Sequence, residues 1–485
     1  MRTDNMAKST TILWFRRDLR VTDNPALHAA LAQSDQVIPV FIYDDAAQRA
    51  PSGAGRWWLH HSLAALKETL ARLGLPLMLR RGDEKTVLTA LTEEYGATAC
   101  YWNRRYEPTA IETDKTLKAE MLSRDIRVES FNGNLIREPW EVKTGAGNHY
   151  RVFTPFWRAL QKIGPARTQA PAPNSQPLEQ CSDRDSDDIE NWNLLPKQPN
   201  WAVGFAKEWN PGEDAALAKL DAFLDGGADR YADGRDRPDI EATSRLSPHL
   251  AFGEISPLTI WERTHAAIAA GTVDETNAFK FLSQIAWRDF SYNLLFHHPQ
   301  LPNTPLKPEF EDYPWQDDEE RLNAWQSGQT GYPIVDAGMR QLWKTGWMHN
   351  RVRMVVASFL IKDIGAHWRN GLAWFEDTLV DADLANNCAS WQWVAGSGAD
   401  AAPFFRIFNP VTQGEKFDPE GTYVREFVPE LGDMPKKYIH APWTAPDEIL
   451  AEAGVTLGEN YPKQMLDHKA ARDFALAAYK TIRNK

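Results

Sequence analysis

The chain has 485 residues, of which 43% are hydrophobic and 25% are charged, as is ordinary for a globular protein of two or three domains. Its formal net charge of −12 argues against a nonspecific nucleic-acid coat, so we expect any polyanion to bind at a local basic cavity. The three cysteines lack metal-binding spacing and no apolar run is long enough to span a membrane, which predicts a reduced, cytoplasmic protein without a membrane segment or metal site.

Residues 10–135 alternate strand-like and helix-like runs. The strand-like runs lie at residues 11–15, 37–43, 75–79, 97–102 and 126–131, and the helix-like runs at residues 25–31, 55–73, 84–95 and 109–124. This order predicts an α/β N-terminal domain with a doubly wound parallel sheet, whose ligands would bind at the carboxyl ends of the strands. Arg16–Arg20 stands where a glycine-rich phosphate loop would follow the first strand, which disfavours a dehydrogenase or a kinase.

The alternation stops near Ile136. Residues 136–208 mix prolines with an acidic patch and have the composition of an interdomain linker. Helical patterns then dominate residues 209–485, which predicts an all-α C-terminal domain. Ten of the 20 tryptophans lie between Trp261 and Trp393, and composition alone favours a bulky core over base stacking or redox chemistry.

One segment of this helical region reverses the sign of the charge. Residues 337–362 contain five Lys or Arg and no Asp or Glu, and an apolar stripe from Met348 to Leu360 predicts a helix over residues 347–364. On this helix Arg353 lies roughly 100° around the axis from its sequence neighbours, so the helix can contact two partners. Taken alone, the pattern fits a cationic surface helix beside core tryptophans better than a site.

A second segment, residues 231–248, is dense in hydroxyls and arginine. Hydroxyl groups, backbone N–H groups and arginine together suit a pyrophosphate. Ser and Thr before a helix are more often simple caps, so this segment alone leaves both interpretations open.

A series of motifs resembles the photolyase and cryptochrome flavoproteins, in the right order and over residues 10 to 480. They are Trp14–Arg20, Asp23–Pro25, Thr243–Ser247, Trp287–Phe290, Gly331–Asp336, Trp347–Met354, Asp381–Trp393 and Phe405–Pro410. Within the family the chain is most similar to bacterial photolyases that act on cyclobutane pyrimidine dimers. The resemblance implies a monomer that binds UV-damaged DNA and carries FAD in its helical domain. The reduced FAD would pass an electron to a dimer flipped out of the duplex, and the cyclobutane ring would split.

The resemblance also implies a role for individual residues. The FAD would be held by Tyr231, Thr243, Ser244, Arg245, Leu246, Ser247, Phe281, Asp381, Asp383 and Asn387, with Arg353 paired to Asp381. Electrons would reach the flavin through Trp391, Trp368 and Trp315. The lesion would contact Gln284, Trp287, Asn350, Arg351, Met354 and Trp393, and the DNA would contact Arg235, Arg288, Arg406 and Gln413.

Two departures from the family pattern qualify the specificity. Gln284 stands where dimer photolyases of this type carry Glu, and a Gln here is reminiscent of (6-4) photolyases. The two histidines that (6-4) enzymes need are replaced by Asn350 and Met354, which favours a dimer photolyase over a (6-4) photolyase. The second departure concerns the antenna, because Thr109-Ala110 and Asn303 stand at the positions of the usual folate contacts. The sequence leaves two antenna chromophores open, an 8-hydroxydeazaflavin and a methenyltetrahydrofolate bound in another pose.

A cryptochrome that senses blue light is the main alternative, and a flavoprotein that binds DNA without turnover is a third. The retained set of dimer-contact residues favours repair.

Overall fold

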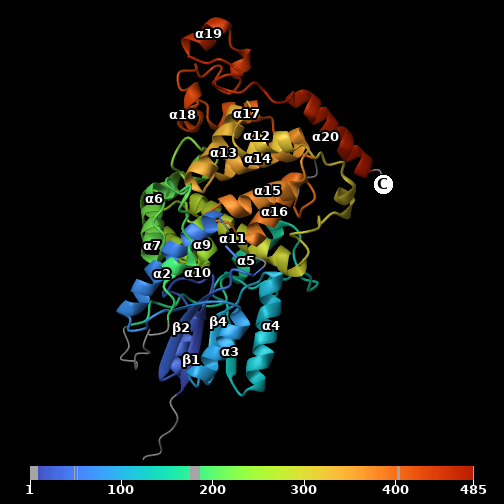
Figure 1. Ribbon diagram of the computed structural model, residues 1–485. Helices are drawn as coiled ribbons and strands as arrows, with labels where there is room; N and C mark the ends of the chain where they lie inside the picture. The colour runs from blue at the N-terminus through green and yellow to red at the C-terminus, as the bar shows by residue number, and fades with distance from the viewer. Residues whose placement is uncertain (1–8, 48–49, 52, 175–185, 401–404, 484–485) are drawn as a thin grey trace, which may run out of the picture.

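The computed structural model describes residues 9–47, 50–51, 53–174, 186–400 and 405–483. It consists of an α/β region and a larger helical region, which lie at the bottom and the top of Figure 1. Within the described residues, no helix is both long enough and apolar enough to cross a bilayer.

The α/β region is built on a parallel sheet with the strand order β3-β2-β1-β4-β5. Its elements are β1 Thr10–Phe15, α1 Pro25–Gln33, β2 Gln36–Tyr43, α2 Gly53–Arg72, β3 Met78–Arg81, α3 Glu84–Glu94, β4 Ala99–Asn103, α4 Pro108–Ser123 and β5 Arg127–Phe131. Every residue of β1 is buried because α1 and α2 cover one face of the sheet and α3 and α4 cover the other. The predicted doubly wound sheet is therefore confirmed.

The direction of winding reverses between β1 and β4, which are neighbours in the sheet although they are separated by two strands in the chain. The carboxyl ends of such strands form the crevice in which α/β sheets usually bind ligands. Here the helical region packs over that end of the sheet (Figure 1).

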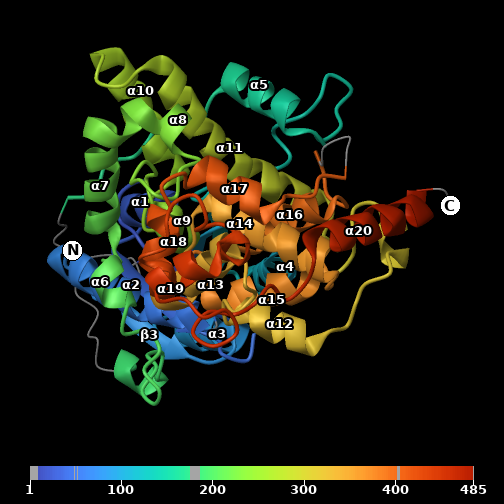
Figure 2. The same cartoon turned by 90° about the horizontal axis from the view of Figure 1, so that it is seen from above.

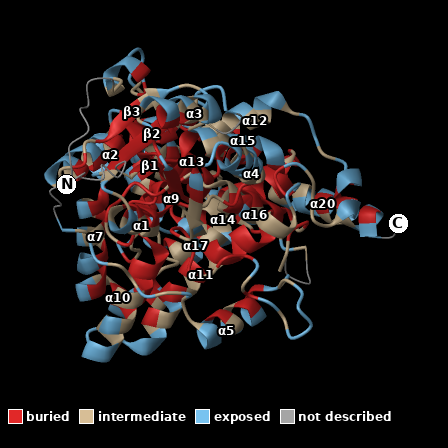
Figure 3. Cartoon of the chain, turned by 90° about the horizontal axis from the view of Figure 1, so that it is seen from below, coloured by how far each residue is buried: buried red, intermediate tan, exposed pale blue. Residues whose placement is uncertain are grey.

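The helical region is all-α, as predicted. Its α-helices are α5 Phe153–Ile163, α6 Phe205–Glu208, α7 Glu213–Ala222, α8 Tyr231–Gly234, α9 Ser247–Phe252, α10 Pro257–Ala270, α11 Glu275–His297, α12 Glu319–Gln326, α13 Pro333–Thr345, α14 Asn350–Ser358, α15 Trp368–Thr378, α16 Leu384–Ala395, α17 Pro410–Phe417, α18 Thr422–Phe427, α19 Asp447–Glu452 and α20 His468–Arg483. Shorter 3₁₀ or π turns are η1 Ile189–Trp192, η2 Phe223–Gly227, η3 Ala228–Arg230, η4 Pro308–Asp312, η5 Phe359–Ile364, η6 Pro429–Leu431 and η7 Pro442–Thr444. Buried residues concentrate in the strands and along α11, whereas the far end of α10 is exposed (Figure 3).

The described parts of the predicted linker, residues 136–174 and 186–208, pack against the rest of the protein. Phe156 and Leu160 of α5 join the core of the helical region, and α5 lies alongside α11 (Figure 2). Further along, Trp192 stacks on Tyr43 of the sheet with ring centroids 5.3 Å apart. The two ends of this segment thus belong to different hydrophobic cores.

Two predicted boundaries were wrong. Strand β3 begins at Met78 instead of Leu75, and Pro76 explains the delay because it has no N–H to donate to the sheet. The basic helix begins at Asn350 instead of Trp347, since the His349 ring accepts a hydrogen bond from the Arg351 N–H and caps the helix there. Its last part widens into the π turn η5 and ends at Gly365, whose φ is 81°.

Candidate functional site

The helical region encloses a cavity of about 500 Å³ between α8, α9, α11 and α14 to α16. All ten residues expected to hold FAD line it, and so do Arg353 and Trp391. The expected lesion and DNA contacts on its wall are Arg235, Gln284, Trp287, Arg288, Asn350, Met354 and Trp393. Tyr231 and Trp393, which are 162 positions apart in the sequence, therefore meet around one space.

An ion pair joins α14 to the segment before α16. The Arg353 guanidinium donates to the Asp381 carboxylate over 2.8 Å and, through Nε, to the Met348 carbonyl over 2.8 Å. The predicted pairing of these two residues is confirmed. The second oxygen of Asp381, Oδ1, is buried without a hydrogen-bond partner within the described structure. Because Asp381 also lines the cavity, this oxygen is an acceptor that a bound group can satisfy.

Asp383 has a structural role at the same edge. One carboxylate oxygen caps α16 by accepting the Asn386 N–H at 2.9 Å, and the other accepts the Tyr292 hydroxyl at 2.5 Å. Burial and the Asp383 charge raise the pKa of Tyr292 well above its usual value, so its proton stays in this bond. One turn further along α16, the Asn387 amide donates to the Leu372 carbonyl over 3.1 Å, which fixes its orientation.

The hydroxyl-rich loop 243–247 is held by aromatic contacts. Arg245, whose φ of 49° is left-handed, lays its guanidinium over the rings of Trp209 and Trp347 at 4.4 and 5.0 Å. The same guanidinium pairs with Glu208 at 3.1 Å, and the Trp347 indole donates to the Ser247 hydroxyl over 3.3 Å. The loop therefore reaches the cavity with its backbone and hydroxyl groups in a fixed position.

The two predicted lesion rings, Trp287 and Trp393, are half-buried on the cavity wall. Beside them Gln284 turns back on its own helix, where its amide donates to the Ser283 hydroxyl over 2.8 Å and to the Lys280 carbonyl over 3.2 Å. His349 is buried, and this burial lowers its pKa to about 4, so the ring is neutral at physiological pH. The ring serves as the cap of α14.

The predicted DNA contacts do not form one group. Arg235 lines the cavity, and Arg406 is exposed. Arg351, which we expected on the cavity wall, is drawn away by an ion pair with Asp236 at 2.9 Å. Arg288 is only 8% exposed and donates to the Asn134 carbonyl over 2.5 Å, at the junction between the two regions. Gln413, on α17, is half-buried, its carbonyl oxygen has no hydrogen-bond partner among the described residues, and it is not part of the wall.

The three predicted electron carriers lie on different elements around α15: Trp391 on α16, Trp368 at the start of α15 and Trp315 before α12. Trp391 is 2% exposed and its indole lies so close to Gly371 that a Cβ there would clash. Trp368, at the start of the same helix, is 1% exposed. Its ring centroid is 5.5 Å from that of His367, which in turn is 4.7 Å from the half-buried Trp315. The arrangement leads from the cavity wall toward the surface.

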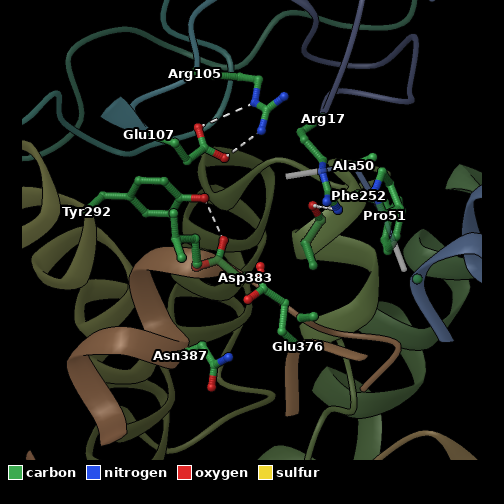
Figure 4. Close-up of a pocket in the computed structure, with 14 residues that line it drawn as sticks. Arg17, Ala50, Pro51, Arg105, Glu107, Phe252, Tyr292, Glu376, Asp383 and Asn387 are labelled. Atoms are coloured by element: carbon green, nitrogen blue, oxygen red, sulfur yellow. Dashed lines mark hydrogen bonds and ion pairs between the residues drawn. The ribbon is translucent and has the colours of Figure 1, made fainter. Parts of the chain in front are cut away.

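A second, smaller pocket of about 50 Å³ lies where α11, α15 and α16 meet the carboxyl ends of β1 and β4 (Figure 4). Arg105 donates to Glu107 at 3.0 Å, and this charge and hydrogen bond outweigh burial and lower the pKa of Glu107 to about 2. Arg17 and Asp383 also face this space. Its volume has room for a few water molecules and is too small for an antenna chromophore. The crevice that an α/β sheet usually offers to a ligand is thus filled by charged side chains.

Sequence reasoning missed three residues that shape the site. Tyr292 holds Asp383, Trp347 supports the loop 243–247, and His349 begins α14. Tyr292 lies four residues after Arg288 and stacks under its guanidinium at 4.9 Å, so the helical spacing was a usable signal. The other two depend on contacts between distant segments.

Comparisons with known proteins agree with this arrangement. Residues 281–481 match the family described as the FAD binding domain of DNA photolyase, and residues 11–175 match the family described as DNA photolyase. The chain is 50% identical to a deoxyribodipyrimidine photo-lyase of Agrobacterium fabrum, over 99% of both chains. It is 38% identical to cryptochrome-1 of Arabidopsis thaliana, over 95% of this chain and 69% of that protein. A crystal structure of a bacterial class III photolyase from Agrobacterium tumefaciens superimposes with a TM-score of 0.95, at 50% identity and complete coverage of both chains.

Proposed function

The chain belongs to the photolyase and cryptochrome family, and we propose that it is a deoxyribodipyrimidine photo-lyase that uses light to split cyclobutane pyrimidine dimers in DNA. The observation that carries this function is the single cavity in which the expected flavin contacts and both lesion rings meet. The similarity over 99% of the chain to a photolyase supports repair over light sensing.

The residues present fit an FAD. The cavity volume of about 500 Å³ suits a ligand of this size, and Asp381 Oδ1 is a buried acceptor that needs a donor. Thr243, Ser244 and Ser247 offer hydroxyls for the phosphates, while Phe281 and Leu246 offer apolar surface. When bound and reduced, the flavin supplies the light absorption and the electron for the repair.

The protein's own residues position this group and keep its surroundings dry. Arg353 neutralises Asp381, which would otherwise be a costly buried charge. Tyr292 and the cap of α16 hold Asp383, and the Leu372 carbonyl orients Asn387. We propose that Asp381, Asp383 and Asn387 contact the flavin ring from these fixed positions.

A dimer within a duplex must leave the base stack to reach such a cavity, and damaged pairing lowers the cost of that step. Trp287 and Trp393 would receive it between their rings, with Asn350 and Met354 completing the wall. The neutral, capping role of His349 and the absence of histidine at positions 350 and 354 support dimers over (6-4) products as the substrate.

We also propose that Trp391, Trp368 and Trp315 carry electrons to the flavin when light reduces it. The packing of Trp391 against Gly371 of α15, the place of Trp368 at the start of that helix and the ring of His367 between Trp368 and Trp315 support this route. Arg235 and Arg406 are the predicted phosphate contacts that the structure leaves accessible to DNA.

The division of the chain into residues 10–135, 136–208 and 209–485 is part of the same proposal, as are a monomeric state and a cytoplasmic location. The core between the sheet and helices α3 and α4 lies wholly within residues 10–135 and supports the division, whereas a second core joins the other face of the sheet to Phe252 and Trp347 of the helical region. Three cysteines without a paired framework support a reducing compartment.

The direct test is a repair assay on purified, chemically reduced protein under blue light. Oligonucleotides with a cyclobutane thymine dimer should lose the dimer in the light and keep it in the dark. A parallel substrate with a (6-4) product should stay unchanged. Equal dimer content in light and dark samples would refute repair and favour a cryptochrome.

A further inference from the structure

The indole of Trp287 is covered on one face. The ring of Phe153, the first residue of α5, stacks on it with centroids 3.8 Å apart and an angle of only 9° between the planes. Phe153 is 8% exposed, so this contact is part of the protein interior. One face of Trp287 is therefore fixed by the protein, and a base can stack only against the other face or the edge.

Asp400 connects this stack to Trp393, the other predicted lesion ring. Its carboxylate accepts the Phe153 N–H over 3.4 Å, although the two residues are 247 positions apart. Its backbone carbonyl accepts the indole N–H of Trp393 over 3.1 Å. The N–H groups in the first turn of a helix have no partner within the helix, so Asp400 satisfies a donor that Val152, the residue before α5, leaves open.

The backbone of Asp400 is itself unusual. Its φ is 52°, in the left-handed region that asparagine, aspartate and glycine tolerate best. Burial raises the pKa of its carboxyl, while the Phe153 N–H lowers it. A half-buried carboxylate on a left-handed residue is an unfavourable combination unless the contacts that it makes are needed.

We propose that Asp400 and Phe153 are positioning residues that set the distance between Trp287 and Trp393, and thereby the selectivity of the protein for a flipped-out dimer over undamaged DNA. Phe153 supports one ring from behind, and Asp400 ties that support to the indole of the other ring. A dimer has two joined bases of fixed thickness, so a gap of fixed width would favour it over a single flexible base. This inference rests on the proposed function, because it takes the two indoles as the walls that hold the lesion.

The test compares three variants with the parent protein. Asp400→Gly removes the carboxylate and keeps the left-handed backbone without strain, and Asp400→Asn keeps an acceptor oxygen at the same place. Phe153→Leu removes the stacked ring and keeps apolar bulk. Dissociation constants are measured for a dimer-bearing strand and for the same strand without damage.

We expect Asp400→Gly to weaken binding of the dimer-bearing strand about tenfold, the effect of one hydrogen bond to a charged group, with binding of the undamaged strand changed less than about twofold. Phe153→Leu should weaken dimer binding about three- to tenfold through the lost stacking. Asp400→Asn should resemble the parent. The flavin content and the repair rate of dimers already bound should stay within about twofold of the parent in all three variants. The contacts of Phe153 and Asp400, which we call the clamp, act on binding of the dimer and not on the reaction.

A second readout does not depend on DNA. Hydrogen exchange of the backbone over residues 150–158 should be faster in Asp400→Gly than in the parent and unchanged in Asp400→Asn, since only the first loses the acceptor of the Phe153 N–H. Equal exchange in all proteins would overturn the clamp itself. Faster exchange with an unchanged ratio of the two dissociation constants would overturn its role in selectivity. A parent protein that fails to distinguish damaged from undamaged strands would instead refute the proposed function.

Discussion

At the scale of single residues, Gln284 is the predicted lesion contact that departs from the pattern of dimer photolyases. Its amide donates to the Ser283 hydroxyl and the Lys280 carbonyl, so part of its hydrogen-bonding capacity is spent on its own helix. A glutamate cannot donate those bonds and would accept hydrogen bonds from the lesion instead, with the greater strength of a charged acceptor.

We therefore expect Gln284→Glu to increase the number of dimers repaired per absorbed photon, by about twofold or more. The measurement is dimer loss against absorbed dose at saturating substrate. Ser283→Ala is the matched control, because it frees the glutamine amide without adding charge and should change the yield less. A lower yield in Gln284→Glu would contradict the assignment of position 284 to the lesion contact.

Trp391 gives the sharpest test of the electron route. It is 2% exposed and packs against Gly371 and Phe375, so its indole is shielded from solvent. Replacing it by phenylalanine removes the easily oxidised indole and leaves a small cavity. Trp391→Phe should slow light-driven reduction of the flavin at least about tenfold, while the chemically reduced variant repairs dimers at close to the parent rate.

The control for this variant is Trp261→Phe, which removes another buried indole, 6% exposed, from α10 away from the proposed route. Flavin absorbance under continuous illumination with a reductant reports both variants. Equal photoreduction in Trp391→Phe and Trp261→Phe would rule out Trp391 as the first carrier.

At the scale of elements, the sequence was most informative where a local pattern decides the structure. The apolar stripe of the basic helix and the separate direction of Arg353 follow from helical spacing, and both are present in α14. The start at Asn350 and the π turn η5 were not predictable in this way. The first depends on which nitrogen of His349 meets the Arg351 N–H, and the second on packing against distant segments.

The same distinction separates the two halves of the site. The strands and their order in the chain were predicted by alternation, because the central strands β1, β2 and β4 are apolar runs buried on both faces. The residues that line the cavity were predicted only through the resemblance to a family. The cavity joins α8, α11, α14 and α16 through contacts that no local sequence pattern contains. The diversion of Arg351 to Asp236 could not be predicted for the same reason.

The contact between α11 and the segment after the sheet carries a testable dependence on pH. Asp289 on α11 accepts the N–H groups of Ile136 and Arg137, yet its other oxygen is buried without a partner within the described structure. Burial raises the pKa of Asp289 to about 7, with the charge of Arg288 opposing the shift. The folded protein then binds a proton that the unfolded chain releases near pH 4, so stability falls as the pH rises from about 4 to about 7.

Asp289→Asn resembles the protonated acid and keeps an acceptor for both N–H groups. At pH 8 it should raise the midpoint of thermal unfolding by a few degrees relative to the parent, and at pH 5 the difference should shrink. Circular dichroism at the two pH values measures it. Because histidines also titrate in this range, the informative quantity is the difference between variant and parent at each pH. A difference that is the same at both values would contradict the raised pKa.

At the scale of the whole molecule, an acidic protein must bind a polyanion through a small number of cations. The formal net charge is −12, and several arginines near the cavity are already engaged, Arg288 by a carbonyl, Arg351 by Asp236 and Arg353 by Asp381. Few counterions can then be released when DNA binds, so affinity should depend on salt less steeply than in proteins with a broad basic face.

Because few cations contact the DNA, the contribution of one arginine to the salt dependence of binding is measurable. Each phosphate contact to a single strand adds about 0.7 to the slope of log affinity against log salt concentration, and each contact to a duplex about 0.9. Arg406 is exposed, so Arg406→Ala should reduce the slope by about the contribution of one phosphate contact. It should weaken the binding of damaged and undamaged DNA equally. Arg72→Ala removes an exposed arginine of the α/β region that pairs with Asp214, and it should leave the slope unchanged. Equal slopes for Arg406→Ala and the parent would place the phosphate contacts elsewhere, whereas a selective loss for damaged DNA would move Arg406 from the backbone to the lesion.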